Sequence, residues 1–351
     1  MDEKDKLKLM DSGEWRAQAE FKGNAGFHIN ELYSPWKRWH EITSDYLKAR
    51  KHDEMLRVFQ NTSLGLTYES ALGEMLDWKS LYLNNRRDYI SGTQLSIEDV
   101  LFVTMGCDVQ KDRLELECVG WAQDKRSFSL SYDVLLGDTS QPEVWAQLTD
   151  IIQNQTWTTP NKSELKVALA AVDSGYQTQL VYNYVRKFRQ NVIAIKGNPH
   201  LRTMVGYPKS VDISMRKNKV ASGSRFFPVG VNIIKNELFS LLRLERPMPN
   251  EPYPPGYCSF PEHYNEEYFQ GLTSEAIKEE IFRGERRLVF KKLPETRNEI
   301  LDGRVYARAA ASLHGLDRFS EEHWTKIKRE LGLLNPVEKK EKKKKNFLKN
   351  L

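Results

Sequence analysis

The stretch LFVTMGCDVQKDRLELECVGWA, residues 101–122, carries the pattern that decides the fold. Residues 101–110 are apolar enough to form a buried strand, and apolar residues in 113–122 alternate with glutamates, which predicts a second strand. A third, half-exposed strand is expected at 126–136. Three successive antiparallel strands are the simplest arrangement of these segments.

Helical and apolar segments alternate after the three strands. The pattern predicts a helix at 141–155, a buried strand at 166–173 (KVALAAVD), a helix at 177–189 and a strand at 191–197. A strand, a helix and a strand at this spacing favour parallel pairing through a right-handed crossover. The order of elements therefore predicts an α/β fold, a mixed sheet with helices on both faces.

The chain after these elements is less regular. Residues 198–230 are basic and contain several glycines and prolines, which indicates a hairpin or loop. The last clear helix opens with Thr296-Arg297-Asn298-Glu299, which fits a capping box. Further elements are expected as helices at 231–244, 273–284 and 297–314 and as a strand at 287–292.

Length and composition indicate a globular protein that forms either two domains or one large domain with a long extra segment. The chain has 351 residues, of which 40% are hydrophobic and 29% charged, enough to bury a sizeable core. No window approaches the roughly 18 apolar residues of a membrane span, and the charged start MDEKDKLKL lacks the apolar stretch of a secretory signal. We therefore expect a cytosolic protein with no membrane partner. The three widely spaced cysteines predict buried thiols rather than disulfides or zinc ligands.

The formal net charge of +5 lies in the C-terminal tail. Residues 337–351 contain seven lysines and two glutamates, so the remaining residues are formally neutral. Such a charge run predicts a solvated, unfolded terminus. Binding to nucleic acid or to an acidic protein and a purely solubilising role are both consistent with it.

Aspartates close two of the predicted buried strands. Asp108 ends the first strand and Asp173 ends KVALAAVD, and an aspartate there serves either turn chemistry or a functional charge. Asp302 lies about one turn into the last helix, one position from an apolar stripe. A turn or cap is favoured for any single aspartate, but the strand order favours convergence of all three. Three such carboxylates suit two divalent cations in phosphodiester cleavage.

Five segments, spread over about residues 100–316, carry a family resemblance. They are GCDVQKDRLELECVGWA, AAVDSGYQT, AIKG, FPVGVNIIKNELF and RNEILDGRVYARAAA. Together they resemble the nuclease domain of tailed-phage terminase large subunits of the lambda-like GpA family. The resemblance implies an RNase H-like fold and a DNA endonuclease of genome packaging that uses two Mg²⁺ or Mn²⁺ ions. The family's acidic residues, on the first strand, at the end of the fourth and on a late helix, correspond to Asp108, Asp173 and Asp302.

Residues 13–68 resemble the end of the packaging ATPase domain of the same family. No GxxxxGK[ST] phosphate loop occurs in this chain, so no ATPase activity is expected from it alone. A split gene, a decayed prophage copy and a fragment fit this organisation equally well. The expected parts are an ATPase-domain remnant at 1–70, a linker at 71–99, a nuclease domain at 100–318, and a helix with a disordered lysine-rich tail at 319–351.

The resemblance also implies partners and a location. Double-stranded DNA is the expected substrate, a small terminase subunit would select the site, and a portal or prohead would receive the complex. If the gene is split, the missing ATPase part is a further partner. The protein would act in the host cytoplasm.

The basic segment 198–230, together with Lys196 before it, is the expected DNA-binding surface, because lysine and arginine bind the phosphate backbone irrespective of sequence. Lys196 could neutralise a phosphate, although a solvated strand end explains it equally well. The expected DNA-binding residues are Lys196, Arg202, Lys209, Arg216, Lys217, Lys219 and Arg225.

Several alternatives stay open. Asn232 stands where the family commonly has an aspartate, so it either alters a metal or basic contact or caps a helix. Asp112 is a second candidate ligand near Asp108, but a turn between strands is favoured for it. The alternative to an endonuclease is a non-catalytic module that docks on DNA or on a partner, as a degenerate prophage terminase fragment would.

Overall fold

The structure is a computed structural model in which the chain forms two compact units, residues 1–74 and 75–351. Of two hairpins, only the backbone is described at 211–215, 219–224, 279–282 and 285–288. The described residues are 5–17, 21, 23, 25–49, 53–66, 76–87, 89, 94–97, 99–188, 190–215, 219–282 and 285–334.

The N-terminal unit has a small core of its own. Ile42, Ala49 and Phe59 are buried together, and Trp39 and Leu64 pack against them. Its identity as the end of an ATPase domain stays a prediction. Its described α-helices are α1 (Lys6–Asp11), α2 (Trp39–Ala49) and α3 (Asp53–Val58).

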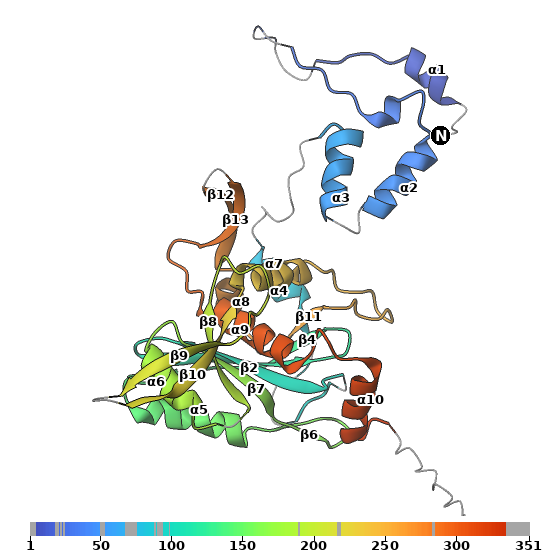
Figure 1. The fold of residues 1–351 in the computed structure, drawn as a ribbon. Helices are drawn as coiled ribbons and strands as arrows, with labels where there is room; N and C mark the ends of the chain where they lie inside the picture. Colours follow the sequence, from blue (N-terminus) through green and yellow to red (C-terminus); the bar gives the residue numbers. More distant parts are fainter. Residues whose placement is uncertain are drawn as a thin grey trace, which may run out of the picture. The chain divides into compact units, whose positions relative to one another are not determined.

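The second unit is built around a mixed sheet, which has nine strands among the described residues (Figure 1). The order of the strands is β1-β11-β4-β3-β2-β7-β8-β10-β9. Two antiparallel pairs, β12 with β13 and β5 with β6, form separate small sheets. The strands are β1 (Arg86–Arg87), β2 (Phe102–Val109), β3 (Arg113–Trp121), β4 (Ser127–Leu136), β5 (Trp157–Thr158), β6 (Glu164–Leu165), β7 (Val167–Asp173), β8 (Val192–Gly197), β9 (Lys209–Met215), β10 (Lys219–Val229), β11 (Cys258–Pro261), β12 (Glu275–Phe282) and β13 (Glu285–Lys292).

The pairing of the strands confirms the predicted sheet. β2, β3 and β4 are antiparallel neighbours, as three successive strands joined by short turns should be. β7 is parallel to β2 on one side and to β8 on the other. Because β2 and β7 run in the same direction, their carboxyl ends meet at one edge of the sheet.

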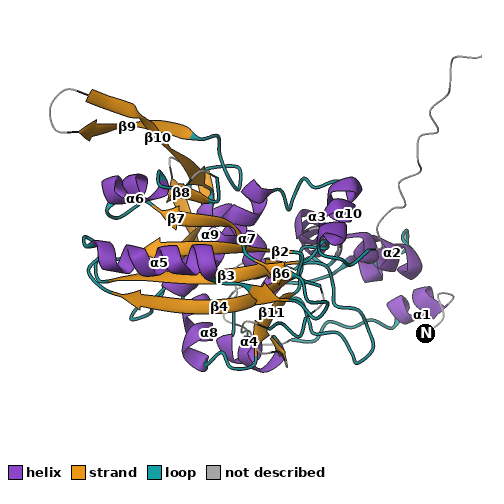
Figure 2. Ribbon diagram, turned by 90° about the horizontal axis from the view of Figure 1, so that it is seen from below, coloured by secondary structure: helices purple, strands orange, loops and turns teal. Residues whose placement is uncertain are grey.

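Helices cover both faces of the sheet, as predicted. α5 and α6 lie on one face and α7 and α9 on the other (Figure 1 and Figure 2). Side chains alternate between these layers: Met105 and Val172 pack toward α5 and α6, and Ala171 packs toward α7 and α9. This architecture is consistent with an RNase H-like nuclease fold. The helices of this unit are α4 (Trp78–Asn84), α5 (Pro142–Asn154), α6 (Thr178–Val185), α7 (Val231–Leu242), α8 (Glu266–Leu272), α9 (Glu299–His314) and α10 (Glu321–Glu330).

The backbones of α9 and β2 touch directly. A Cβ atom on Gly106 would lie 2.0 Å from the carbonyl oxygen of Gly303 and 2.5 Å from the amide nitrogen of Ala307. The Thr104 hydroxyl donates a 2.8 Å hydrogen bond to the Ala307 carbonyl. The absence of a side chain at Gly106 therefore allows helix and strand to meet at this point.

One predicted helix, 273–284, is wrong, because β12 occupies this segment and forms a hairpin with β13. Its alanine, lysine and glutamates favour a helix locally, but cross-strand pairing overrides that preference. Glu275 lies opposite Lys292, and Ile277 lies opposite Phe290. An acid therefore faces a base, and two apolar residues face each other, across the hairpin.

The predicted capping box is also wrong. α9 begins at Glu299 with Asn298 as its N-cap, and the Asn298 side chain makes no capping hydrogen bond. The Thr296 hydroxyl instead donates to the backbone carbonyls of Ser274 and Leu293. The Thr296 hydroxyl, which a capping box would use, therefore bonds to carbonyls that precede the helix.

The described part of the predicted linker contributes to the second unit. Leu81 of α4 is buried in the core beneath the sheet, and β1 joins the sheet beside β11. The Tyr89 hydroxyl donates to the carbonyls of Ser129 and Ser259.

The lysine-rich tail, residues 337–351, lies outside the described residues. In the described ranges, no helix combines the length and the apolarity that crossing a lipid bilayer requires.

Alanine substitutions at the two facing glycines should have opposite effects on stability. Gly106→Ala places a Cβ atom against helix backbone, so we expect a loss of about 2–3 kcal/mol in the free energy of unfolding. At Gly303 the nearest atom to an added Cβ is 3.8 Å away, and Gly303→Ala should stabilise α9 by about 0.5–1 kcal/mol. Urea denaturation of both variants checks this; a harmless Gly106→Ala would contradict the direct contact.

Candidate functional site

Two of the predicted site residues end neighbouring parallel strands. Asp108 is the penultimate residue of β2, and Asp173 is the last residue of β7. The parallel register runs up to the residues just before them, which places the two aspartates side by side. Gly106 and Ala171, two residues earlier on each strand, lie on the face that α9 covers, so alternation turns both aspartates to that face.

Asp302 reaches the same edge of the sheet from α9. It lies in the first turn of the helix, immediately before Gly303, which meets β2. Burial raises the pKa of Tyr306 well above its ordinary value, and the nearby charges of Asp173, Asp302 and Asp108 raise it further. The structure therefore brings the three predicted aspartates together around one turn of α9.

Burial raises the pKa values of the three carboxyls, and the charges of neighbouring carboxylates add to the effect. Burial raises the pKa of Asp108 to about 7, and the charges of Asp302 and Asp173 add to the effect. Burial likewise raises the pKa of Asp173 to about 6, and Asp302 again adds to it. Burial also raises the pKa of Asp302, against the opposing charge of Lys235. The site therefore holds negative charge that the protein compensates only in part.

Neutral donors orient the two strand-end carboxylates. The Gln110 side-chain amide donates to Asp108 Oδ2 at 2.5 Å. The backbone N–H of Gly175 donates to Asp173 Oδ2 at 3.0 Å. These bonds fix each carboxylate through one oxygen.

Asp302 is oriented by a charged donor and a neutral one. Lys235 of α7 places its Nζ 2.9 Å from Oδ1, and the Asn298 side chain donates to Oδ2 at 2.9 Å. Lys235 also forms an ion pair of 2.8 Å with Glu275, the first residue of β12. Elements from three parts of the chain therefore meet at this carboxylate.

A further carboxylate lies beside the aspartates. Glu299 Oε1 accepts from Arg113 at 2.8 Å, and Arg113 also donates to Glu115 at 2.6 Å. Glu299 Oε2 is buried and has no hydrogen-bond partner among the described residues, although Arg297 Nε lies 3.7 Å away. The charge of Glu299 contributes to the raised pKa of Asp108, which burial dominates.

The donor set suits a hard divalent cation, since carboxylate oxygens are the ligands that Mg²⁺ and Mn²⁺ prefer. Within the described ranges, no group of three or more His, Cys, Asp or Glu side chains is arranged to hold a metal ion. The oxygens of Asp302 contact Lys235 and Asn298. Asp108, Asp173 and Asp302 are the residues that could hold such an ion.

Sequence reasoning missed Lys235, Glu275, Asn298 and Glu299. Glu275 lay in the wrongly predicted helix, and Asn298 and Glu299 were assigned to the capping box. Lys235 carried a usable signal, because it shares the helical spacing of the buried residues of α7. A lysine on an apolar helical stripe indicates a buried ionic partner.

The basic residues border one side of the sheet. Lys196 follows Ile195, which pairs with Asp173 in the register, and its charge opposes the burial-driven rise in the pKa of Asp173. β9 and β10 form a hairpin at the edge of the sheet, next to β8 (Figure 2). Arg216 and Lys217 lie outside the described residues, and only the backbone of Lys219 is described. The exposed members are Lys196, Arg202, Lys209 and Arg225.

Two residues with open alternatives have defined contacts. The Asn232 side chain donates to the Pro199 carbonyl at 3.0 Å, and Gly230 rather than Asn232 is the N-cap of α7. Asp112 lies exposed in the turn between β2 and β3 and pairs with Arg113 at 2.7 Å. These contacts are those of a loop anchor and a turn residue.

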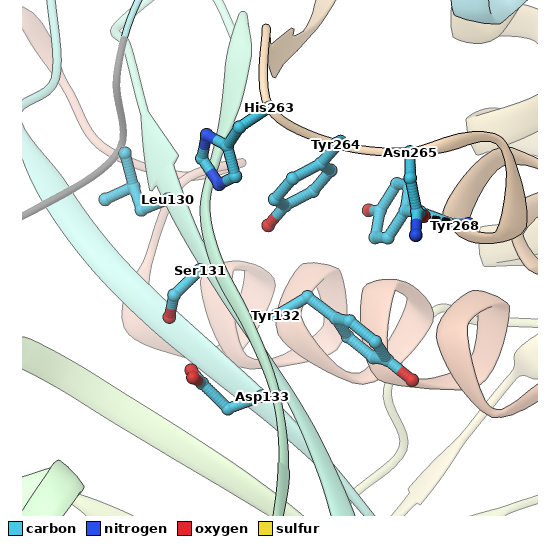
Figure 3. A pocket seen from close by; sticks show the side chains of 8 residues that line it. All are labelled: Leu130, Ser131, Tyr132, Asp133, His263, Tyr264, Asn265 and Tyr268. Atoms are coloured by element: carbon cyan, nitrogen blue, oxygen red, sulfur yellow. Dashed lines mark hydrogen bonds between the residues drawn. The ribbon is translucent and has the colours of Figure 1, made fainter.

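A separate hollow of about 340 Å³ lies between β4 and the start of α8 (Figure 3). Its lining includes Tyr132, Asp133 and Tyr264, and none of the three clustered aspartates. Figure 3 shows the Tyr264 hydroxyl directed toward β4. The hollow is therefore distinct from the carboxylate cluster.

Comparison with known proteins shows a family that matches most of the chain. Residues 24–324 match the family described as "Terminase large subunit gpA, endonuclease domain". The chain is 29% identical over 290 residues to the terminase large subunit of Enterobacteria phage P21. It is also 29% identical over 294 residues to that of Escherichia phage lambda. Each alignment covers 81% of this chain and 43% of the relative, so the chain spans less than half the length of these relatives.

No solved structure matches the chain significantly.

The raised pKa of Asp108 predicts a pH dependence of stability. The folded protein keeps this proton up to about pH 7, whereas the unfolded chain releases it near 3.8, so stability falls as pH rises between these values. Asp108→Asn removes the effect. Relative to this variant, the metal-free wild type should lose roughly 2–4 kcal/mol between about pH 4 and pH 8. Urea denaturation in EDTA measures it; a difference that is constant with pH would contradict the shift.

Proposed function

Since this chain belongs to the family of terminase large subunit gpA endonuclease domains, we propose that it is a metal-dependent endonuclease that cuts double-stranded DNA during phage genome packaging. Asp108, Asp173 and Asp302 would hold two Mg²⁺ or Mn²⁺ ions. The single observation that carries the proposal is that two buried strand-end carboxyls, those of Asp108 and Asp173, come together with the partly exposed carboxyl of Asp302 on α9.

The charge of the cluster supports this assignment. Burial and repulsion raise the pKa values of Asp108 and Asp173 to about 7 and about 6, which marks an uncompensated negative site. Structural carboxylates at strand ends normally gain stability from a basic partner or stay exposed. A cluster that is unstable alone and suited to oxygen-loving cations is the expected arrangement for metal-assisted hydrolysis.

The protein's own groups would position the reactants. When bound, two divalent ions would supply a polarised water and a counter-charge for the leaving oxygen. Gln110 and the Gly175 N–H fix the orientation of the strand-end aspartates, and Lys235 with Asn298 fixes Asp302. The direct contact of α9 with β2 keeps Asp302 at a fixed position relative to the strand-end aspartates.

DNA would bind through its phosphate backbone. Lys196, beside the cluster, is suited to bind a phosphate near the cleaved bond. The exposed basic residues of the β9–β10 hairpin are suited to bind the flanking phosphate backbone. Such contacts carry little sequence information. We therefore assign site selection to a small terminase subunit and delivery to a portal or prohead, in the host cytoplasm. We assign no ATPase activity to this chain alone.

Cleavage should depend on Asp173. In manganese buffer the chain should nick supercoiled plasmid. Asp173→Ala should lower the rate about a hundredfold or more, since loss of a residue that only supports a metal ligand already costs about 10–100-fold. Asp112→Asn is the matched control, because this exposed aspartate lies in the adjacent turn and should leave nicking unchanged. Gel electrophoresis of the plasmid forms measures the rates.

Equal nicking by wild type and Asp173→Ala would remove the assignment. Loss of nicking in Asp112→Asn, with nicking kept in Asp173→Ala, would indicate that Asp112 rather than Asp173 is a metal ligand. A folded wild type that neither nicks DNA nor releases heat on manganese addition would favour a docking module.

Removing two basic side chains of the β9–β10 hairpin should weaken DNA binding and reduce its salt dependence. Lys209 and Arg225 are exposed on the paired strands β9 and β10. The double variant Lys209→Ala/Arg225→Ala should lower the slope of log affinity against log salt by about 2. Fluorescence anisotropy with duplex DNA measures it, with Lys326→Ala on α10 as the control. An unchanged slope would place the DNA elsewhere.

A further inference from the structure

Asp302 and Glu275 share the same two donors. Lys235 Nζ lies 2.8 Å from Glu275 Oε1 and 2.9 Å from Asp302 Oδ1. The Asn298 side-chain nitrogen lies 2.9 Å from Glu275 Oε1 and 2.9 Å from Asp302 Oδ2. Both oxygens of Asp302 are therefore engaged by groups that Glu275 also binds.

The ammonium of Lys235 is enclosed within this cluster. Its side chain is 7% exposed, and that of Glu275 is 6% exposed. Two carboxylates compensate this buried ammonium, since Glu275 lies 2.8 Å and Asp302 2.9 Å from its Nζ. A buried charge with two such ion-pair partners is the arrangement that stabilises a protonated lysine.

A cation that binds Asp302 has to share it with this ammonium. Lys235 contributes one positive charge and the two carboxylates two negative ones, so the cluster carries a net charge of −1. In a buried site such charges act strongly on each other. The more firmly Lys235 binds Glu275, the less of its charge acts on Asp302.

We propose that Lys235 is a resident counter-ion that competes with a divalent cation for Asp302, and that Glu275 sets the strength of this competition by binding the same ammonium. The inference rests on the proposed function, in which Asp302 is a metal ligand. Lys235 and Glu275 are positioning residues in it, because they act through Asp302.

The proposal predicts opposite effects from the two partners. In Glu275→Gln the ammonium is left to Asp302 alone, so manganese should bind more weakly. In Lys235→Met the counter-ion is gone, so manganese should bind more tightly. The double variant Lys235→Met/Glu275→Gln restores the net charge of −1 and should return close to the wild-type affinity. Damage to the fold alone would not produce changes of opposite sign that cancel.

Calorimetric titration of the metal-free full chain with MnCl₂ at neutral pH provides the test, with circular dichroism to confirm folding. We expect the dissociation constant to rise about three- to tenfold in Glu275→Gln, to fall by a similar factor in Lys235→Met, and to stay within about twofold in the double variant. Glu275→Gln leaves Lys235 paired with Asp302, so it keeps the test valid if Lys235→Met does not fold.

Glu237→Gln is the matched control. Glu237 lies on the same helix as Lys235 and pairs with Arg308 of α9 at 2.7 Å, so this variant also breaks an ion pair between α7 and α9. The manganese affinity of this variant should equal that of wild type.

The outcomes separate the two proposals. If Asp302→Asn loses manganese binding while Glu275→Gln binds as tightly as wild type or tighter, the competition is overturned and the nuclease assignment stands. Shifts of the same sign in Glu275→Gln and Lys235→Met would also overturn it. If wild type and Asp302→Asn give no binding heat alike, both proposals fall.

Discussion

The direct contact between the backbones of α9 and β2 is the constraint on which the rest of the site depends. Gly106 leaves no side chain between them, and the carbonyl of Gly303 fills that space. Asp302 precedes Gly303, and Asp108 lies two residues beyond Gly106, so this contact brings the helix carboxylate to the strand carboxylate. If α9 and β2 were farther apart, the carboxylate of Asp302 would not reach the edge of the sheet where Asp108 lies.

A buried arginine fixes the orientation of α9 about its own axis. Arg304, 1% exposed, donates to Ser127 and Ser129 and pairs with Glu117. Buried ion pairs add little net stability, but they specify one orientation, since any other leaves a buried charge unpaired. The helix that carries Asp302 is therefore specified by charge as well as by shape.

The sequence predicts those elements whose structure depends on their own residues, and it fails for those that depend on distant partners. Alternation in 113–122 and the apolar runs at 101–110 and 166–173 predict the central strands, because burial of a strand needs no distant information. β12 escaped prediction because its strand character comes from pairing with β13.

The candidate site divides in the same way. Asp108 and Asp173 are visible as acids at the ends of buried strands, and Asp302 entered through its helix and the family resemblance. Lys235 and Glu275 form a pair only because the β12–β13 hairpin packs against α7. The sequence near either residue carries no sign of this contact. A capping box was the better local explanation for Asn298, whereas its side chain serves two distant carboxylates.

The spread of the three aspartates along the chain has a consequence for how such domains evolve. The segment from β2 to α9 contains both strand-end carboxylates, the helix carboxylate and the hairpin that begins at Glu275. Recombination with a crossover inside that segment would join halves whose carboxylates and counter-ion were selected in different proteins. Crossovers upstream of β2 leave the set whole. This family should therefore exchange its nuclease centre as an undivided block.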